Sequence, residues 1–158
     1  MVNELAIRRH FSDYMLRRMT ETEIRPWYVA YYSGICENTL RQYLKGLRLP
    51  PPTTLILIAE LFECSVNELL GYEPYYSVRH GRLFDPALDT DSVADYFNGQ
   101  LLNMLADKNI SLDEISIHVN VGVACLDSYL KNHTLPATTI ILGIAEALKC
   151  TPSELLGY

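Results

Sequence analysis

The sequence contains no long apolar run. The longest ones, such as residues 55–59, are far too short to cross a bilayer. Residues 1–14 mix apolar and polar side chains and include Arg8 and Arg9, so they lack the charged-then-apolar pattern of a secretory signal. With 49% apolar and 20% charged residues, the composition is typical of a folded globular protein. We expect a soluble, cytoplasmic protein without a membrane segment.

Cysteine and histidine are too sparse for a metal centre or a disulfide scaffold. The four cysteines include no CxxC pair, and the four histidines are scattered along 158 residues. A zinc site needs several such ligands at close spacing. We therefore expect reduced thiols, no metal and no cofactor. The residues concerned are Cys36, Cys64, Cys125, Cys150, His10, His80, His118 and His133.

Motifs that indicate an enzyme are also missing. The chain has no nucleophile signature and no glycine-rich phosphate loop. Its acidic residues show no motif that assembles a catalytic pair. We expect that the protein is not an enzyme, and that its function is binding.

Charge is distributed unevenly along the chain. The net charge is −6, yet residues 1–50 hold eight arginines and lysines against five acids, a balance of +3. Residues 83–158 hold three lysines against ten acids, a balance of −7. Lysine and arginine supply the contacts with phosphate in nucleic-acid complexes. If one half of the chain binds nucleic acid, it is the first half.

The sequence contains an internal repeat. Residues 67–72, NELLGY, recur as SELLGY at 153–158, an offset of 86. Held without gaps, this offset gives 19 identities in 62 aligned positions between 11–72 and 97–158. Most identities are apolar or turn residues, which a shared core requires. We predict a first unit at 1–72, a linker at 73–91 and a second unit at 92–158.

The sequence of each unit predicts five short helices and no sheet. Capping boxes begin at Ser65, Ser111 and Thr151, each with glutamate three residues later. Pro26 can start a helix that Gly34 ends, and Asn120 with Gly122 supplies the matching turn. The sequence predicts an all-α fold. The expected helices are 6–21, 26–33, 36–47, 53–63 and 66–71, then 92–108, 111–119, 122–132, 138–149 and 152–157.

Two short helices joined by a glycine-containing turn form a helix-turn-helix, whose second helix enters the major groove. Unit one carries an ordered set of apolar and turn residues: Val29, Ala30, Gly34, Ile35, Leu40, Gly46, Pro50, Leu55, Ile58, Ala59, Phe62, Val66, Leu69, Leu70 and Gly71. Unit two carries a corresponding set: Ser111, Ile115, Val121, Leu126, Pro136, Ala145, Leu148, Leu155, Leu156 and Gly157. In these residues both units resemble the lambda-repressor-like (Xre/Cro-type) helix-turn-helix family. The resemblance implies two tandem five-helix units.

The resemblance implies a set of DNA-reading positions in unit one. Asparagine can pair with adenine, arginine with guanine, and glutamate can accept from cytosine, so the set suits base reading. The alternative is that these polar side chains form only the solvated face of a helix. The positions are Glu37, Asn38, Arg41, Lys45 and Arg48.

The same positions in unit two suit DNA poorly. Val123 and Ala124 offer at most a thymine methyl contact, and Asp127 has the wrong sign for phosphate. Lys131 and Thr134 complete the set. We expect this copy to contact protein instead, through unit one, a second chain or another partner. The alternative is a scaffold copy whose surface has drifted.

The segment 26–32, PWYVAYY, carries more aromatic rings than one helix face can bury. With Val29 and Ala30 in the core, we expect the rings to cover the linker, which adds Tyr75 and Tyr76, or to fill a seam between units. The alternative is a contact surface for a partner, because tyrosine and tryptophan are favoured interface anchors.

The sequence thus indicates a sequence-specific DNA-binding transcriptional regulator, a repressor, that binds double-stranded DNA through unit one. Because one reading helix covers few base pairs, we expect a homodimer whose two-fold interface includes Val123 and Ala124 of unit two. The alternative is a protein-interaction module that keeps the helix-turn-helix scaffold without binding DNA. The overall acidity favours it, as do Pro26 and Leu112, which replace the glutamine common in the family.

Overall fold

The computed structural model describes residues 2–74 and 90–158, and this part of the chain contains helices and no strands. The chain divides into two compact units, Asn3–Ser77 and Val78–Tyr158, the second also counting Met1–Val2. The all-α prediction is confirmed. Within the described ranges, no helix combines the length and the apolar character that a membrane span requires.

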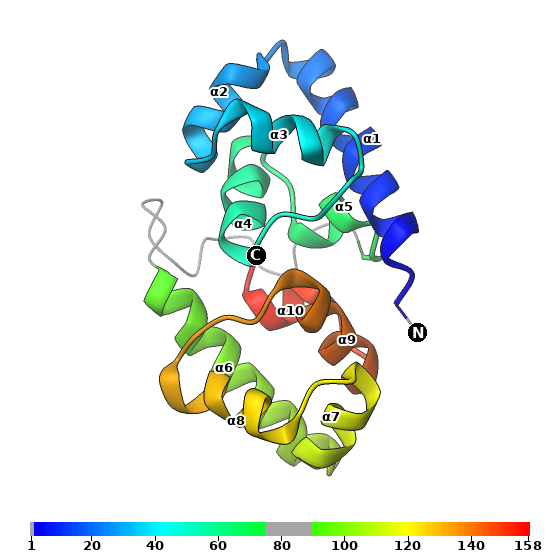
Figure 1. Cartoon of the computed structure of the whole chain (residues 1–158), viewed down its shortest axis with the longest axis vertical. Coiled ribbons are helices and arrows are strands. Elements are labelled where there is room, and N and C mark those ends of the chain that lie inside the picture. The colour runs from blue at the N-terminus through cyan, green and yellow to red at the C-terminus, as the bar shows by residue number, and fades with distance from the viewer. Residues whose placement is uncertain (1, 75–89) are drawn as a thin grey trace. The chain divides into compact units, whose positions relative to one another are not determined.

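Unit one consists of α1 (Glu4–Thr22), α2 (Pro26–Ser33), α3 (Glu37–Leu44), α4 (Pro52–Leu61) and α5 (Val66–Leu70). α1 packs against α3 and α5, while α2 packs against α3 and α4 (Figure 1). Most of the buried side chains are apolar, and burial of such surface supplies the main driving force for folding. Among the largest are Phe11, Met15, Leu40, Tyr43 and Phe62.

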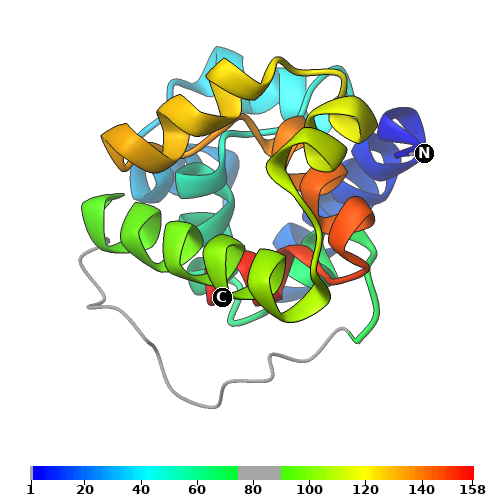
Figure 2. The ribbon, with the colours of Figure 1, turned by 90° about the horizontal axis from the view of Figure 1, so that it is seen from below.

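Unit two consists of α6 (Thr90–Lys108), α7 (Leu112–Val119), α8 (Val123–Asn132), α9 (Thr138–Leu148) and α10 (Pro152–Leu156). α7 packs against α8 and α9, and α10 packs against α6 and α9. In Figure 2, α6 of this unit is drawn in green and α8 in yellow to gold. Its core includes Phe97, Ile115, Leu126, Leu142 and Leu155.

The helices of the two units begin at matching positions. Their first residues are 4 and 90, 26 and 112, 37 and 123, 52 and 138, and 66 and 152. Every pair differs by 86 residues, the offset at which the sequence repeats. The two units therefore place equivalent residues at equivalent points of their helices, so each position in one unit can be compared with its counterpart in the other.

The predicted start and stop signals act as expected, and the three capping boxes differ in how much of the motif the structure shows. Pro26 is the first residue of α2, and Gly34 ends that helix with φ of 70°. Asn120 ends α7 with φ of 57°. At Thr151 both halves of the capping box are present. At Ser65 and Ser111 the structure shows the serine half, in which the hydroxyl accepts from the backbone N–H three residues later.

Some expected boundaries differ from the structure. The third helix was expected to reach residue 47 but ends at Leu44, because Gly46 adopts a left-handed φ of 71° that a helix cannot continue through. The linker was expected to run to residue 91, but α6 already begins at Thr90. Residues 75–89, with Tyr75, Tyr76 and His80, lie outside the described residues.

Candidate nucleic-acid interface

In unit one, α2 and α3 form a helix-turn-helix around a short apolar core. Gly34 makes the left-handed turn, and the Ile35 N–H donates to the Ala30 carbonyl at 3.0 Å. Val29 and Ala30 from α2 and Leu40 from α3 are buried. This packing fixes the angle at which α3 leaves the turn, and one side of α3 is therefore presented to solvent.

All five of the expected reading positions lie on or just after α3 and are exposed. Glu37 and Asn38 occupy its first turn, Arg41 follows one turn later, and Lys45 caps its end. Beyond the helix, the Arg48 guanidinium lies over the Tyr43 ring, 5.4 Å from the ring centre. The structure thus brings these side chains to one element, where their donors and acceptors are open to a ligand.

The end of α3 is held firmly against α1. The Ser12 hydroxyl donates to the Leu44 carbonyl, and Arg8 Nη1 donates to the Leu47 carbonyl at 2.6 Å. Tyr43 is only 2% exposed, and its ring meets Phe11 edge-on at 6.3 Å. These contacts give the exposed residues of α3 a fixed support, which a reading helix needs to hold its side chains in register.

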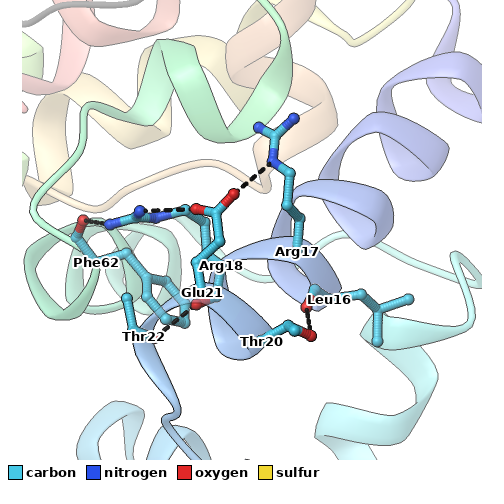
Figure 3. A network of polar contacts seen from close by, with 7 residues as sticks. All are labelled: Leu16, Arg17, Arg18, Thr20, Glu21, Thr22 and Phe62. Carbon is cyan, nitrogen blue, oxygen red and sulfur yellow. Dashed lines mark hydrogen bonds and ion pairs between the residues drawn. The ribbon is translucent and has the colours of Figure 1, made fainter.

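Most other cations of unit one are engaged elsewhere. Arg18 donates to the Phe62 carbonyl at 2.9 Å and to Glu21 at 3.1 Å, while Arg17 lies 3.8 Å from the same carboxylate (Figure 3). This network ties α1 to the end of α4. The positive balance of residues 1–50 is therefore only partly available for phosphate, and its free portion includes the cations of the α3 region.

α8, the counterpart of α3, presents a different surface. Val123 and Ala124 are exposed, as expected, and Leu126 is buried. Asp127 lies 2.8 Å from Lys131 Nζ, and this hydrogen-bonded carboxylate raises the pKa of Lys131. The charge of Lys131 is therefore largely compensated by an acid one turn away. Its counterpart in unit one, Lys45, offers a free cation instead.

The anchor between first and third helices is also different in unit two. Ala94 replaces Arg8, Asn98 replaces Ser12, and His133 stands at the position of Leu47. His133 instead contacts Asp95 at 2.8 Å on the exposed surface of α6. Within the ranges that the structure describes, α8 packs on α7 without the close packing on the first helix that α3 has. Tyr129, the counterpart of Tyr43, is consequently partly exposed.

Most of the aromatic rings of α2 lie on its outer side. Trp27 is 58% exposed, Tyr28 is 39% exposed and Tyr31 is 77% exposed. Tyr32 alone is half-buried, and its hydroxyl donates to Glu60 at 3.4 Å. Val29 and Ala30 are buried as expected, and together with Ser33 they occupy the face of α2 that points inward. The expected contact of the rings with the linker concerns residues outside the described ranges.

The cysteines fall into two pairs of different exposure. Burial raises the pKa of the Cys64 thiol to about 12 and that of Cys150 to about 11, which agrees with their expected place at the edge of the core. Cys36 and Cys125 are exposed. Cys36 caps the start of α3, where hydrogen bonds with the Thr39 side chain and with nearby backbone lower its pKa.

No cluster of three or more His, Cys, Asp or Glu side chains in the described part of the chain has the geometry to hold a metal ion. His10 has a structural contact within unit one, because its Nε2 lies 3.0 Å from the Glu68 carbonyl. The ring also lies under Gly71, whose φ is 85° and where an added Cβ would come within 3.0 Å of the imidazole. This histidine therefore serves packing between α1 and α5.

Residues 100–158 match the family model of the Cro/C1-type HTH DNA-binding domain. The match covers one of the two units and supports the resemblance to the Xre/Cro helix-turn-helix family. No curated protein and no solved structure matches the chain. In the matched unit, two of the five positions that correspond to the reading set of unit one, Val123 and Ala124, are apolar. By this match, the second part of the chain is similar to a helix-turn-helix domain of the DNA-binding type.

Proposed function

We propose that the protein is a sequence-specific DNA-binding transcriptional regulator, acting as a repressor in the cytoplasm, in which unit one reads double-stranded DNA. The observation that carries this proposal is α3: five exposed polar side chains on a helix anchored to α1. Phosphate contacts would come from Lys45 and Arg48, and base contacts from Glu37, Asn38 and Arg41.

We further propose that the two units arose by duplication and have divided their roles. The shared offset of 86 residues in sequence and in helix starts supports the duplication. The exposed Val123 and Ala124 and the paired Lys131 support a role for unit two in contacts with protein. A homodimer formed with the help of unit two would provide the second reader that tight specific binding needs.

A second candidate function is a protein-interaction module without DNA binding. The net charge of −6 favours it, because a duplex repels an acidic protein except where cations are concentrated. The deciding experiment is retention of the intact protein on mixed duplex DNA at low ionic strength. Salt-sensitive retention supports the regulator, whereas absence of retention on every duplex leaves only the interaction module.

Arg41 and Lys45 should have separable effects on DNA binding. Arg41→Ala is expected to lose about 1–3 kcal/mol of binding free energy through the contact with one base pair, and to relax the sequence specificity at that base pair. Lys45→Ala should weaken all duplexes alike and reduce the salt slope by about one. A selection of bound sequences from a random pool, followed by titration at several salt concentrations, distinguishes them. If both variants behave like the wild type, α3 does not read DNA.

Thiol labelling offers an independent map of the interface. Cys36 should react with iodoacetamide at neutral pH roughly a hundredfold faster than Cys64, because the first is exposed and the second is buried and protonated. A bound duplex should protect Cys36 at the start of α3 and leave the exposed Cys125 of α8 reactive. Peptide mass mapping with and without duplex provides the measurement, and equal protection of both thiols would contradict the assignment of unit one as reader.

A further inference from the structure

α2 carries an exposed cluster of rings, which we call the aromatic patch: Trp27, Tyr28 and Tyr31. The Trp27 and Tyr28 rings meet edge-on at 5.7 Å, and Tyr28 and Tyr31 lie 6.4 Å apart. Tyr31 is one of the most exposed large apolar residues described. Three adjacent exposed rings on one short helix are unusual for a surface that only meets water.

Unit two exposes apolar side chains at related positions. Ile117 is 82% exposed and stands 86 residues after Tyr31, so it is the counterpart of that tyrosine on α7. Val123 and Ala124 are exposed at the start of α8, which packs on α7. We call Ile117, Val123 and Ala124 the aliphatic patch. Both units thus leave a large apolar side chain open at the same point of the second helix.

The two patches differ in charge. Residues 24–36, around the aromatic patch, carry one formal charge, that of Arg25. Residues 109–125, around the aliphatic patch, carry two, both negative, on Asp113 and Glu114. All three charged side chains are exposed. A contact between unlike patches therefore brings opposite charges together, while a contact between two aliphatic patches would gather four carboxylates.

We propose that the aromatic patch of one copy of this chain docks on the aliphatic patch of a second copy, and that the contact forms twice in a two-fold dimer. The proposal deepens the proposed function, since it names the surfaces that would pair two readers. A stable dimer buries roughly 1,200 Å² or more of surface in total. Because the contact forms twice in the proposed dimer, each contact needs to bury only half of that area. The rings provide the anchors, because exposed tryptophan and tyrosine contribute large contact area at low entropic cost.

Neither patch includes the residues proposed to contact DNA, which lie on or after α3 of unit one. Val123 and Ala124 are the unit-two counterparts of Glu37 and Asn38. A two-fold contact through Val123 and Ala124 alone would bury only two small side chains from each copy. Reciprocal contact instead joins these small side chains to the rings of the partner.

The test is a complementation experiment in the absence of DNA. Light scattering on the full chain at micromolar concentration should give twice the monomer mass of 18.0 kDa for the wild type. Tyr31→Glu and Ile117→Glu should each give the monomer mass, because every contact then lacks one intact patch. An equal mixture of the two variants should associate more than either variant alone, though at higher concentration than the wild type needs, because a mixed pair keeps one of the two contacts intact: one variant retains the aliphatic patch and the other the aromatic patch.

The controls are Leu16→Glu and Leu102→Glu, which place the same charge at exposed leucines of α1 and α6 outside both patches. They should remain dimeric, and circular dichroism should show that all four variants keep their helices. A monomeric wild type overturns the proposal, as does a mixture that associates no more than either variant alone at any concentration tested; the second result would indicate patches that pair like with like or within one chain. Dimerisation without retention on DNA would overturn the proposed function and leave this inference standing.

Discussion

A Tyr43→Ala variant is expected to lose about 3–5 kcal/mol of the stability of unit one, in the range that truncation of a buried aromatic ring costs. The ring is almost fully buried, meets Phe11 edge-on and lies under the Arg48 guanidinium. Its removal leaves a cavity between α1 and α3. Because the same helix carries the reading positions, affinity for DNA should fall with it.

The single tryptophan makes this measurement specific. Trp27 belongs to α2, so its fluorescence during urea unfolding follows unit one alone, while circular dichroism follows both units. Tyr129→Ala is the matched control: this tyrosine is the counterpart of Tyr43 but is partly exposed, and its loss should cost about 1 kcal/mol and leave the fluorescence transition in place. Equal costs at the two sites would show that α3 and α8 are anchored alike.

The helices could be predicted from the sequence because their signals are local. A proline at a first helical position, a serine or threonine with glutamate three residues on, and a glycine or asparagine in a left-handed turn each act within a few residues. Pro26, Gly34 and Thr151 show this directly, since each marks the boundary that the sequence predicted. The repeat strengthened the prediction, because each signal could be checked against a second copy.

The anchoring of α3 could not be predicted, because it depends on contacts between residues about 30 to 40 positions apart. Nothing local distinguishes Ser12 from any other helix serine, yet its hydroxyl bonds to the Leu44 carbonyl. The number of rings in residues 26–32 already indicated that one helix face cannot bury them all, but not which rings are exposed. The packing of α2 against α3 and α4 leaves Trp27, Tyr28 and Tyr31 exposed, while Tyr32 is half-buried.

The charge of the first half was also a coarse guide. It pointed to unit one, but Arg8, Arg17 and Arg18 bond to backbone carbonyls or to carboxylates of the same unit. The two units differ in which residues lie next to a few of their cations. Lys131 has an aspartate one turn before it, whereas Lys45 has Arg41 at that position. A reading helix is better identified by such neighbours than by net charge.

The largest effect on DNA binding is expected from reversing the three cations of the α3 region together. The triple variant Arg41→Glu, Lys45→Glu, Arg48→Glu should bind duplex DNA at least roughly a hundredfold more weakly at low salt. If all three side chains contact phosphate or base edges, the slope of log affinity against log salt should fall by about 2.7, which is 0.9 for each contact. Fluorescence anisotropy of a labelled duplex at several salt concentrations gives both quantities. The side chains are exposed, so the fold should tolerate the change.

A control must match the change in net charge, because a more acidic protein is repelled by DNA wherever the new charges lie. Arg17→Glu, Lys131→Glu and Lys149→Glu together alter three exposed cations of α1, α8 and the end of α9. Both triple variants shift the net charge from −6 to −12. If binding depends on α3, the control should lose at most a few-fold in affinity and keep its salt slope. If the two variants lose affinity equally, long-range charge and not α3 governs the interaction, and Lys131 in unit two would contribute as much as Lys45.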